Sequence, residues 1–215
     1  MQLNRSSEES TLSKLTTTGE DIFSEKDEQL VWERFIKGDD QSLVYIYRAY
    51  ADVLFRYGRQ FTKRYEFLRD SIQELFYELM DKRSKLSAAK SVKAYLFTAF
   101  KRKIVRDLKK EEKFNLEQEG FLFSLADTNL SIANNLEEKD FTLIQQKLNL
   151  LPVNQREIIL LHFYEGLTYA EIADIMNIKV RSARALTYRA LDSLHKELTP
   201  FKGSLYLFLI QFIIR

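Results

Sequence analysis

The chain has 215 residues, with 33 Lys and Arg against 31 Asp and Glu, no Cys and only two His. The absence of Cys excludes a disulfide framework and a Cys-ligated metal site and fits a reducing cytoplasm, and two His are too few for a His-rich metal or acid–base cluster. With two Pro, six Gly and long segments of helical period, the sequence predicts an all-α protein of one or two domains. The opening residues contain no apolar run, so we expect no signal peptide.

Residues 1–24 are polar and rich in Ser and Thr, and we expect them to be disordered. Apolar residues then recur at helical spacing, which predicts four helices over about 25–38, 41–64, 67–83 and 91–113. Gly38 ends the first of these, and Ser91 is the expected N-cap of the last. Residues 114–140 lack a sustained period and predict a linker.

A second helical group is predicted from about residue 141 to residue 198. Pro152 stands near a helix start, where its missing N–H costs nothing, and Gly166 is a natural residue to follow a helix end. Thr168 and Glu171 form a T-x-x-E capping box, which begins the next helix. Asn177 separates the last two helices and is, after Gly, the residue that most readily adopts a positive φ.

The charge of the chain is unevenly distributed, although its net value is only +2. Residues 90–113 carry nine basic and three acidic residues, whereas residues 114–141 carry one basic and six acidic residues. This separation indicates that the basic block binds an extended polyanionic partner and that the acidic block forms a strap-like segment. Ordinary solvated helix faces are the alternative interpretation.

Residues 168–191 fit a helix-turn-helix. Its packing positions are all apolar and are Ile172, Ala173, Met176, Ile178, Ala183 and Leu186. The outer face of the second helix would meet DNA, because Arg can pair with guanine in two hydrogen bonds and the first turns of such a helix contact base edges. The predicted DNA contacts are Lys179, Arg181, Ser182, Arg184, Ala185, Tyr188 and Arg189. A stand-alone regulator, whose N-terminal half senses or dimerises, is one function compatible with this motif.

The segment "RDSIQELFYELM" (residues 69–80) resembles the D-x-x-Q-E-x-F segment by which bacterial sigma factors grip RNA polymerase. A basic aromatic helix follows it, and residues 151–194 resemble the sigma domain that reads the upstream promoter element. Because no long domain lies between the two, the chain resembles an extracytoplasmic-function (ECF) sigma factor of the sigma-70 superfamily over about residues 28–198.

The resemblance implies an all-α fold of two small helical domains joined by an acidic linker. Residues 25–113 correspond to sigma domain two, with four helices, and residues 141–198 correspond to sigma domain four, with the helix-turn-helix. The linker at 114–140 would thread the polymerase cleft, or would be a flexible tether.

The resemblance also implies site residues. The residues matched to the polymerase-binding motif are Asp70, Gln73, Glu74 and Phe76. The first three share one helix face, whereas Phe76 belongs either to the interface or to the core, and we favour the core. In the family, the loop before the basic helix receives a base flipped out of the minus-ten element, and the helix supports promoter melting. The minus-ten contacts implied here are Lys93, Tyr95, Lys101, Arg102 and Arg106. Tyr95 stands where many relatives carry Trp, and Arg102 where many carry Asn.

We therefore expect a cytoplasmic, non-enzymatic initiation factor that needs no cofactor and no metal and directs core RNA polymerase to specific promoters. Its expected partners are core RNA polymerase and promoter DNA, as duplex and as melted strand, with no small-molecule substrate and no membrane contact. An anti-sigma factor is left open as a further partner, and the stand-alone helix-turn-helix regulator remains the alternative function. The apolar tail at 199–215 would be a docked helix, a partner-binding segment, a membrane-surface contact or an added strand, and we favour the docked helix.

Overall fold

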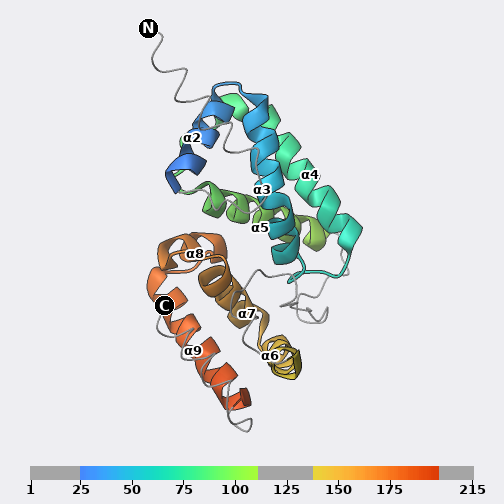
Figure 1. Ribbon diagram of the computed structural model, residues 1–215, viewed down its shortest axis with the longest axis vertical. Helices are drawn as coiled ribbons and strands as arrows, with labels where there is room; N and C mark the ends of the chain where they lie inside the picture. The colour runs from blue at the N-terminus through green and yellow to red at the C-terminus, as the bar shows by residue number, and fades with distance from the viewer. Residues whose placement is uncertain (1–24, 111–137, 199–215) are drawn as a thin grey trace.

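The computed structural model describes residues 25–110 and 138–198, and every regular element in these ranges is helical, which confirms the expected all-α class. The first group contains α2 (Glu25–Ile36), α3 (Asp40–Gly58), α4 (Tyr65–Asp81), the short 3₁₀ turn η1 (Arg83–Lys85) and α5 (Val92–Lys110). The second contains α6 (Glu138–Leu150), α7 (Val153–Ile159), the π-helical turn η4 (Leu160–Tyr164), α8 (Tyr169–Met176) and α9 (Val180–Leu198). Figure 1 shows the first group, blue to green, above the second, yellow to red.

The expected N-terminal segment, the apolar tail and most of the linker lie outside the described residues. At the end of the linker, α6 already begins at Glu138, within the last residues assigned to the linker from the sequence. The second helix was predicted to run to residue 64, but α3 ends at Gly58. Gly58, the last residue of α3, lies against α4 and α5, where an added Cβ would come within 2.7 Å of Leu68 Cδ2, so this close packing requires Gly.

Local capping signals explain where several helices begin. The Asp39 carboxylate accepts hydrogen bonds from the Gln41 backbone N–H at 3.0 Å and from the Ser42 hydroxyl at 2.7 Å, which begins α3. The Ser91 hydroxyl accepts a hydrogen bond from the Ala94 N–H at 3.1 Å, which confirms the N-cap predicted for α5. Such bonds satisfy backbone donors that have no partner inside the helix.

The helix-turn-helix is built as the sequence predicts. Thr168 and Glu171 form a reciprocal capping box at the start of α8, and Asn177 ends that helix in the left-handed region, at φ 53° and ψ 50°. Gly166 also has a positive φ, of 66°. Of the six predicted packing residues, four are buried and two, Met176 and Ile178, are half-buried against the core.

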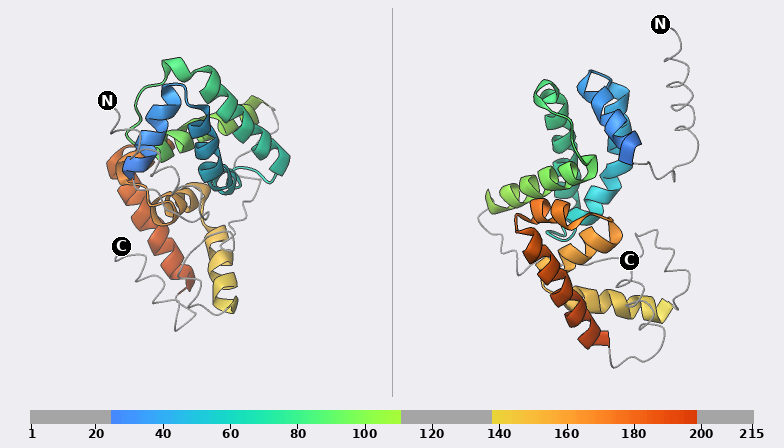
Figure 2. Two further views of the ribbon diagram at one scale, coloured as in Figure 1. Left: turned by 45° about the horizontal axis from the view of Figure 1, so that its top comes forward. Right: turned by 90° about the vertical axis from the view of Figure 1, so that its left-hand side faces the viewer.

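One hydrophobic core runs through both helical groups. In the first group, α2 packs on α3, and α3 and α4 pack on α5, around large buried side chains that include Trp32 and Phe100. In the second group, α9 packs against α6, α7 and α8. The two groups meet where α5 lies against α8, an arrangement that both views of Figure 2 show.

Candidate nucleic-acid interface

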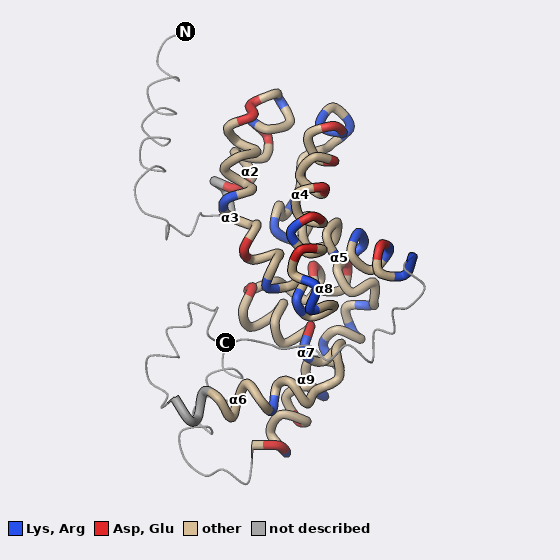
Figure 3. Tube along the Cα trace, turned by 90° about the vertical axis from the view of Figure 1, so that its right-hand side faces the viewer, with Lys and Arg blue, Asp and Glu red and all other residues tan. Residues whose placement is uncertain are grey.

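The predicted polymerase-binding face lies along α4. Asp70 and Gln73 are exposed, and the Glu74 side chain is 64% exposed although its carboxylate forms an ion pair with Lys103 of α5. Burial alone would lower the pKa of Lys103, but hydrogen bonds and charge interactions with Glu74 and Asp107 outweigh it and raise that pKa. Lys103 therefore stays cationic and joins α5 to the inner edge of this acidic face. Figure 3 shows acidic positions along α4 and basic positions along α5.

Two aromatic neighbours in the motif have different environments. Phe76 is only 6% exposed and packs edge to face on Tyr47, with the ring centroids 5.0 Å apart, so it belongs to the core as we favoured. Tyr77, which the sequence analysis did not single out, is 66% exposed. It follows Gln73 and Glu74 at helical spacing and extends their face. An exposed tyrosine beside polar groups is typical of the residues that contribute most to protein interfaces.

The predicted minus-ten residues on α5 fall into two sets. Arg102 and Arg106 are exposed, and Arg106 Nε lies 3.1 Å from a carboxylate oxygen of Asp107. Tyr95 is 37% exposed, and its ring packs on Trp32 of α2 with 5.2 Å between the ring centroids. These three residues are accessible to a nucleic-acid strand.

The other two, Lys93 and Lys101, are paired with acids of the second helical group. Lys93 Nζ lies 2.8 Å from the Glu165 carboxylate and donates to the Glu165 carbonyl at 2.7 Å. Lys101 Nζ lies 2.7 Å from Oε1 of Glu157, which is 3% exposed. The structure thus places two predicted DNA contacts inside the boundary between the groups.

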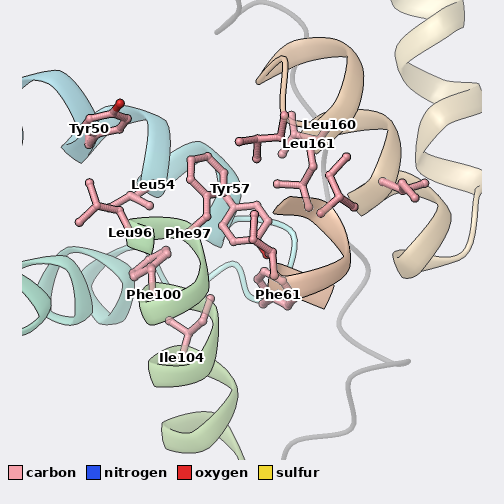
Figure 4. Close-up of a cluster of buried hydrophobic side chains, with 14 of the residues drawn as sticks. Tyr50, Leu54, Tyr57, Phe61, Leu96, Phe97, Phe100, Ile104, Leu160 and Leu161 are labelled. Carbon is pink, nitrogen blue, oxygen red and sulfur yellow. The ribbon is translucent and has the colours of Figure 1, made fainter. Parts of the chain in front are cut away.

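Glu157 also accepts a hydrogen bond from the buried Tyr57 hydroxyl at 2.6 Å. Burial and the neighbouring Glu157 charge raise the pKa of Tyr57 well above its usual value, so the hydroxyl remains a donor. Around this polar centre, Tyr57 and Phe61 of the first group face Leu160 and Leu161 of the second, as Figure 4 shows. The boundary therefore combines an apolar contact with a buried ion pair.

The loop between η1 and α5 forms one side of a cavity of about 240 Å³, lined by Gln29, Trp32, Glu33, Ala88, Ala89 and Lys90. The Trp32 indole N–H donates to the Ser87 carbonyl at 3.1 Å, and the Gln29 amide donates to the Lys90 carbonyl at 2.9 Å. Both bonds fix the loop on α2. Base capture was predicted at this loop, but the contribution of α2 was not predicted, because Trp32 lies in an amphipathic helix and has the pattern of a core residue.

The predicted upstream contacts on α9 and at its N-terminal boundary all lie on the exposed side of the motif; they are Lys179, Arg181, Ser182, Arg184, Ala185, Tyr188 and Arg189. Tyr188 is 73% exposed. Arg189 Nε donates to the Ala185 carbonyl at 3.3 Å, and the Arg184 guanidinium lies 5.3 Å from the ring centroid of Tyr169 on α8. The face is basic and aromatic and stands opposite the buried packing residues, as a DNA-reading helix requires.

Within residues 25–110 and 138–198, no group of three or more His, Cys, Asp or Glu side chains could hold a metal ion. The same ranges contain no helix that is both long enough and apolar enough to span a bilayer.

Comparisons with known proteins agree with this geometry. The family model for sigma-70 region 2 matches residues 46–114, which include α4 and α5, and the model for sigma-70 region 4 matches residues 141–194, which include the helix-turn-helix. No curated protein matches the chain.

Two solved structures resemble the chain over most of its length. One is CnrH in complex with the cytosolic domain of CnrY, with 18% identity, a TM-score of 0.56 and coverage of 81% of this chain and 99% of that one. The other is the sigma factor RpoE in complex with the anti-sigma factor NepR from Bartonella quintana, with 20% identity, a TM-score of 0.54 and coverage of 77% and 99%. At these identities the likeness concerns the fold. Together the two family models match more than half of the chain, with region 2 followed by region 4, and the protein belongs to the sigma-70 family of sigma factors, which direct core RNA polymerase to promoters.

Proposed function

We propose that this sigma factor reads the minus-thirty-five element with the outer face of α9, engages the minus-ten element with α5, and grips core RNA polymerase with α4. The observation that carries the proposal is the exposed basic face of α9, which the left-handed turn at Asn177 sets against a buried packing face. On α4, the proposed polymerase contacts are Asp70, Gln73, Glu74 and Tyr77, with Phe76 supporting them from the core. The factor would act in the cytoplasm and have no catalytic activity of its own.

The cavity beside the loop at 86–91 is the proposed site for a base flipped out of the minus-ten element. Trp32 forms part of its wall, and Gln29 and Glu33 also line it. Flipped bases are held in proteins by stacking and by hydrogen bonds to their edges. Arg102 and Arg106, which are exposed on the following helix α5, would follow the strand through its phosphates.

Engagement of DNA by Lys93 and Lys101 would require the two helical groups to separate. Both lysines now neutralise carboxylates of the second group, and phosphates would have to replace Glu165 and Glu157. A partner that holds the groups together would therefore suppress promoter binding. Because RpoE was solved with an anti-sigma factor, we propose a protein of this class as a regulator of this chain as well.

The test is a pull-down with bacterial core RNA polymerase, followed by run-off transcription from genomic DNA with sequencing of the transcripts. We expect the chain to bind core and to start transcription at a defined set of promoters. Arg181→Ala and Arg184→Ala should each weaken recognition by about 1–3 kcal/mol if the side chain pairs with guanine, whereas Lys196→Ala, at the far end of α9, should leave base preference unchanged.

Equal losses on matched and scrambled upstream elements would assign the two arginines to phosphates. Failure to bind core, combined with sequence-specific DNA binding by the chain alone, would favour the stand-alone regulator.

A further inference from the structure

We propose that Tyr169 is a positioning residue, which holds the guanidinium of Arg184 in the orientation that reads one base pair of the upstream element. The inference rests on the proposed function, because it requires Arg184 to contact a base. Its basis is a stack of side chains that crosses the helix-turn-helix from η4 through α8 to α9.

The stack begins at His162 in the π-helical turn. The ring centroids of His162 and Tyr169 lie 4.3 Å apart, with 32° between the ring planes. Nδ1 of His162 lies 3.0 Å from the Leu167 carbonyl oxygen. The Arg184 guanidinium carbon lies 5.3 Å from the centroid of the Tyr169 ring. Tyr169 is thus held by His162 and in turn supports Arg184.

The backbone under this stack is fixed by local bonds. Tyr169 is the first residue of α8, directly after Thr168, whose hydroxyl and N–H both bond to the Glu171 carboxylate, at 2.7 Å and 2.8 Å. The capping box therefore fixes the backbone that carries the ring, and the contact with His162 holds the ring itself, both in the absence of DNA. A ring placed in advance can orient a side chain before the duplex arrives.

Orientation matters for arginine because guanine recognition needs both N–H groups of one planar edge to be aimed at O6 and N7. An exposed arginine otherwise samples many rotamers, and the entropy lost on binding reduces the discrimination between bases. Stacking on an aromatic ring removes part of that freedom. An exposed cation–π contact corresponds to roughly a two- to fivefold factor in an equilibrium constant.

The inference predicts an effect at one base pair only. Arg181 stands one turn earlier on the same exposed face and is not stacked on a ring in the described structure. The base pair that Arg181 contacts therefore serves as an internal control. A general loss of helix-turn-helix stability would reduce the preference at both positions together.

The experiment measures base preference by holoenzyme, assembled from the full chain and core RNA polymerase, on a duplex library. The library is randomised over the upstream element and carries a fixed minus-ten region from a promoter found by run-off sequencing. Bound DNA is sequenced for wild type, Arg181→Ala, Arg184→Ala, Tyr169→Leu, Tyr169→Met, Tyr169→Phe and the double variant Tyr169→Leu with Arg184→Ala, and the two arginine variants identify the base pair that each arginine reads. Melting temperatures are measured for each variant, and two aliphatic replacements are made so that misfolding of one does not decide the result.

We expect Arg184→Ala to abolish the preference at one base pair, and Tyr169→Leu and Tyr169→Met to lower the preference there by roughly two- to fivefold. Tyr169→Phe, which keeps the ring, should retain the wild-type preference. In the Arg184→Ala background, Tyr169→Leu should change nothing further at that position.

Three results would contradict the inference, and they have different meanings. If Arg184→Ala leaves every position unchanged, Arg184 reads no base, and the proposed function of this residue fails together with the inference. If Arg184→Ala removes the preference but both aliphatic variants of Tyr169 keep it, only the positioning role fails. Equal losses at the Arg181 and Arg184 positions would also overturn that role, since they would indicate a structural effect on the whole motif.

Discussion

Replacement of Glu157 by Gln should weaken the contact between the two helical groups. The carboxylate is 3% exposed and accepts hydrogen bonds from Tyr57 at 2.6 Å and Lys101 at 2.7 Å. A Gln side chain keeps an oxygen for Tyr57 but leaves the Lys101 charge without its partner. Breaking a buried ion pair costs about 3–5 kcal/mol, and because the Lys101 side chain is 18% exposed and can recover some hydration, we place the loss at about 3 kcal/mol.

Separation of the two helical groups sets an upper limit to this loss of free energy. If the groups separate, both Lys101 and residue 157 become hydrated and the penalty disappears. The Glu157→Gln variant should therefore show a lower free energy of unfolding, a larger distance between the groups, or both. Glu157→Leu should lose roughly 1–3 kcal/mol more in the closed state, since the buried Tyr57 hydroxyl then has no acceptor.

The assay combines urea denaturation with energy transfer between two dyes. The chain has no native cysteine, so Ser84→Cys in the first group and Asp192→Cys in the second provide unique labelling sites. The matched control is Glu66→Gln, whose 81% exposed carboxylate lies 2.7 Å from Arg69 and whose loss should cost about 0.5 kcal/mol or less. Unchanged unfolding and unchanged energy transfer in Glu157→Gln would refute the role of this ion pair.

Three further predictions concern single residues. Asp70→Ala should weaken binding to core polymerase in a pull-down and should retain its helicity by circular dichroism. The control Glu66→Ala, on the same helix, should bind normally. Loss of helicity in Asp70→Ala would indicate a structural role. Asn177→Ala should lower the free energy of unfolding by about 1 kcal/mol because its φ is 53°, and Asn177→Gly should stay within about 0.5 kcal/mol of wild type; equal effects in urea denaturation would contradict this. Burial would raise the pKa of Glu171, but hydrogen bonds from Ser91 and Thr168 lower that pKa overall. The stabilisation that the Glu171 carboxylate gives to the folded state is therefore fully present above the ordinary value of 4.5 and is lost as the pH falls through the pKa in the folded state. The unfolding midpoints of wild type and Glu171→Gln should therefore converge as the pH falls below 4.5 and through the lowered pKa of Glu171 in the folded state.

The sequence predicted those parts of the fold that depend on neighbouring residues. The capping box at Thr168, the N-cap at Ser91 and the left-handed turn at Asn177 each act over one to four residues, so a local pattern was sufficient to find them. The exposed face of α9 could be predicted for the same reason, because helical spacing alone separates it from the packing face.

The contacts between distant segments could not be predicted in this way. Lys101 and Glu157 are 56 residues apart, and nothing in either segment indicates that the two side chains meet. Lys101 was accordingly predicted to contact DNA, and its ion pair with Glu157 was not predicted. The need for Gly at position 58 has a similar cause, since Leu68 of α4 and Phe100 of α5 leave no space there for a side chain.

The π-helical turn η4 also limits how the length of this protein can change. In η4 the Glu165 N–H bonds to the Leu160 carbonyl at 3.0 Å, so this turn contains one residue more than an α-helical turn would. Deletion of one residue here would restore a regular helix but would rotate the positions after it by about 100° relative to those before it. Glu165 would then point away from Lys93, while Leu160 and Leu161 would keep their places on the first group. The turn thus contains one residue more than a regular helix would, and we expect single deletions in 162–164 to be tolerated less well than conservative substitutions there.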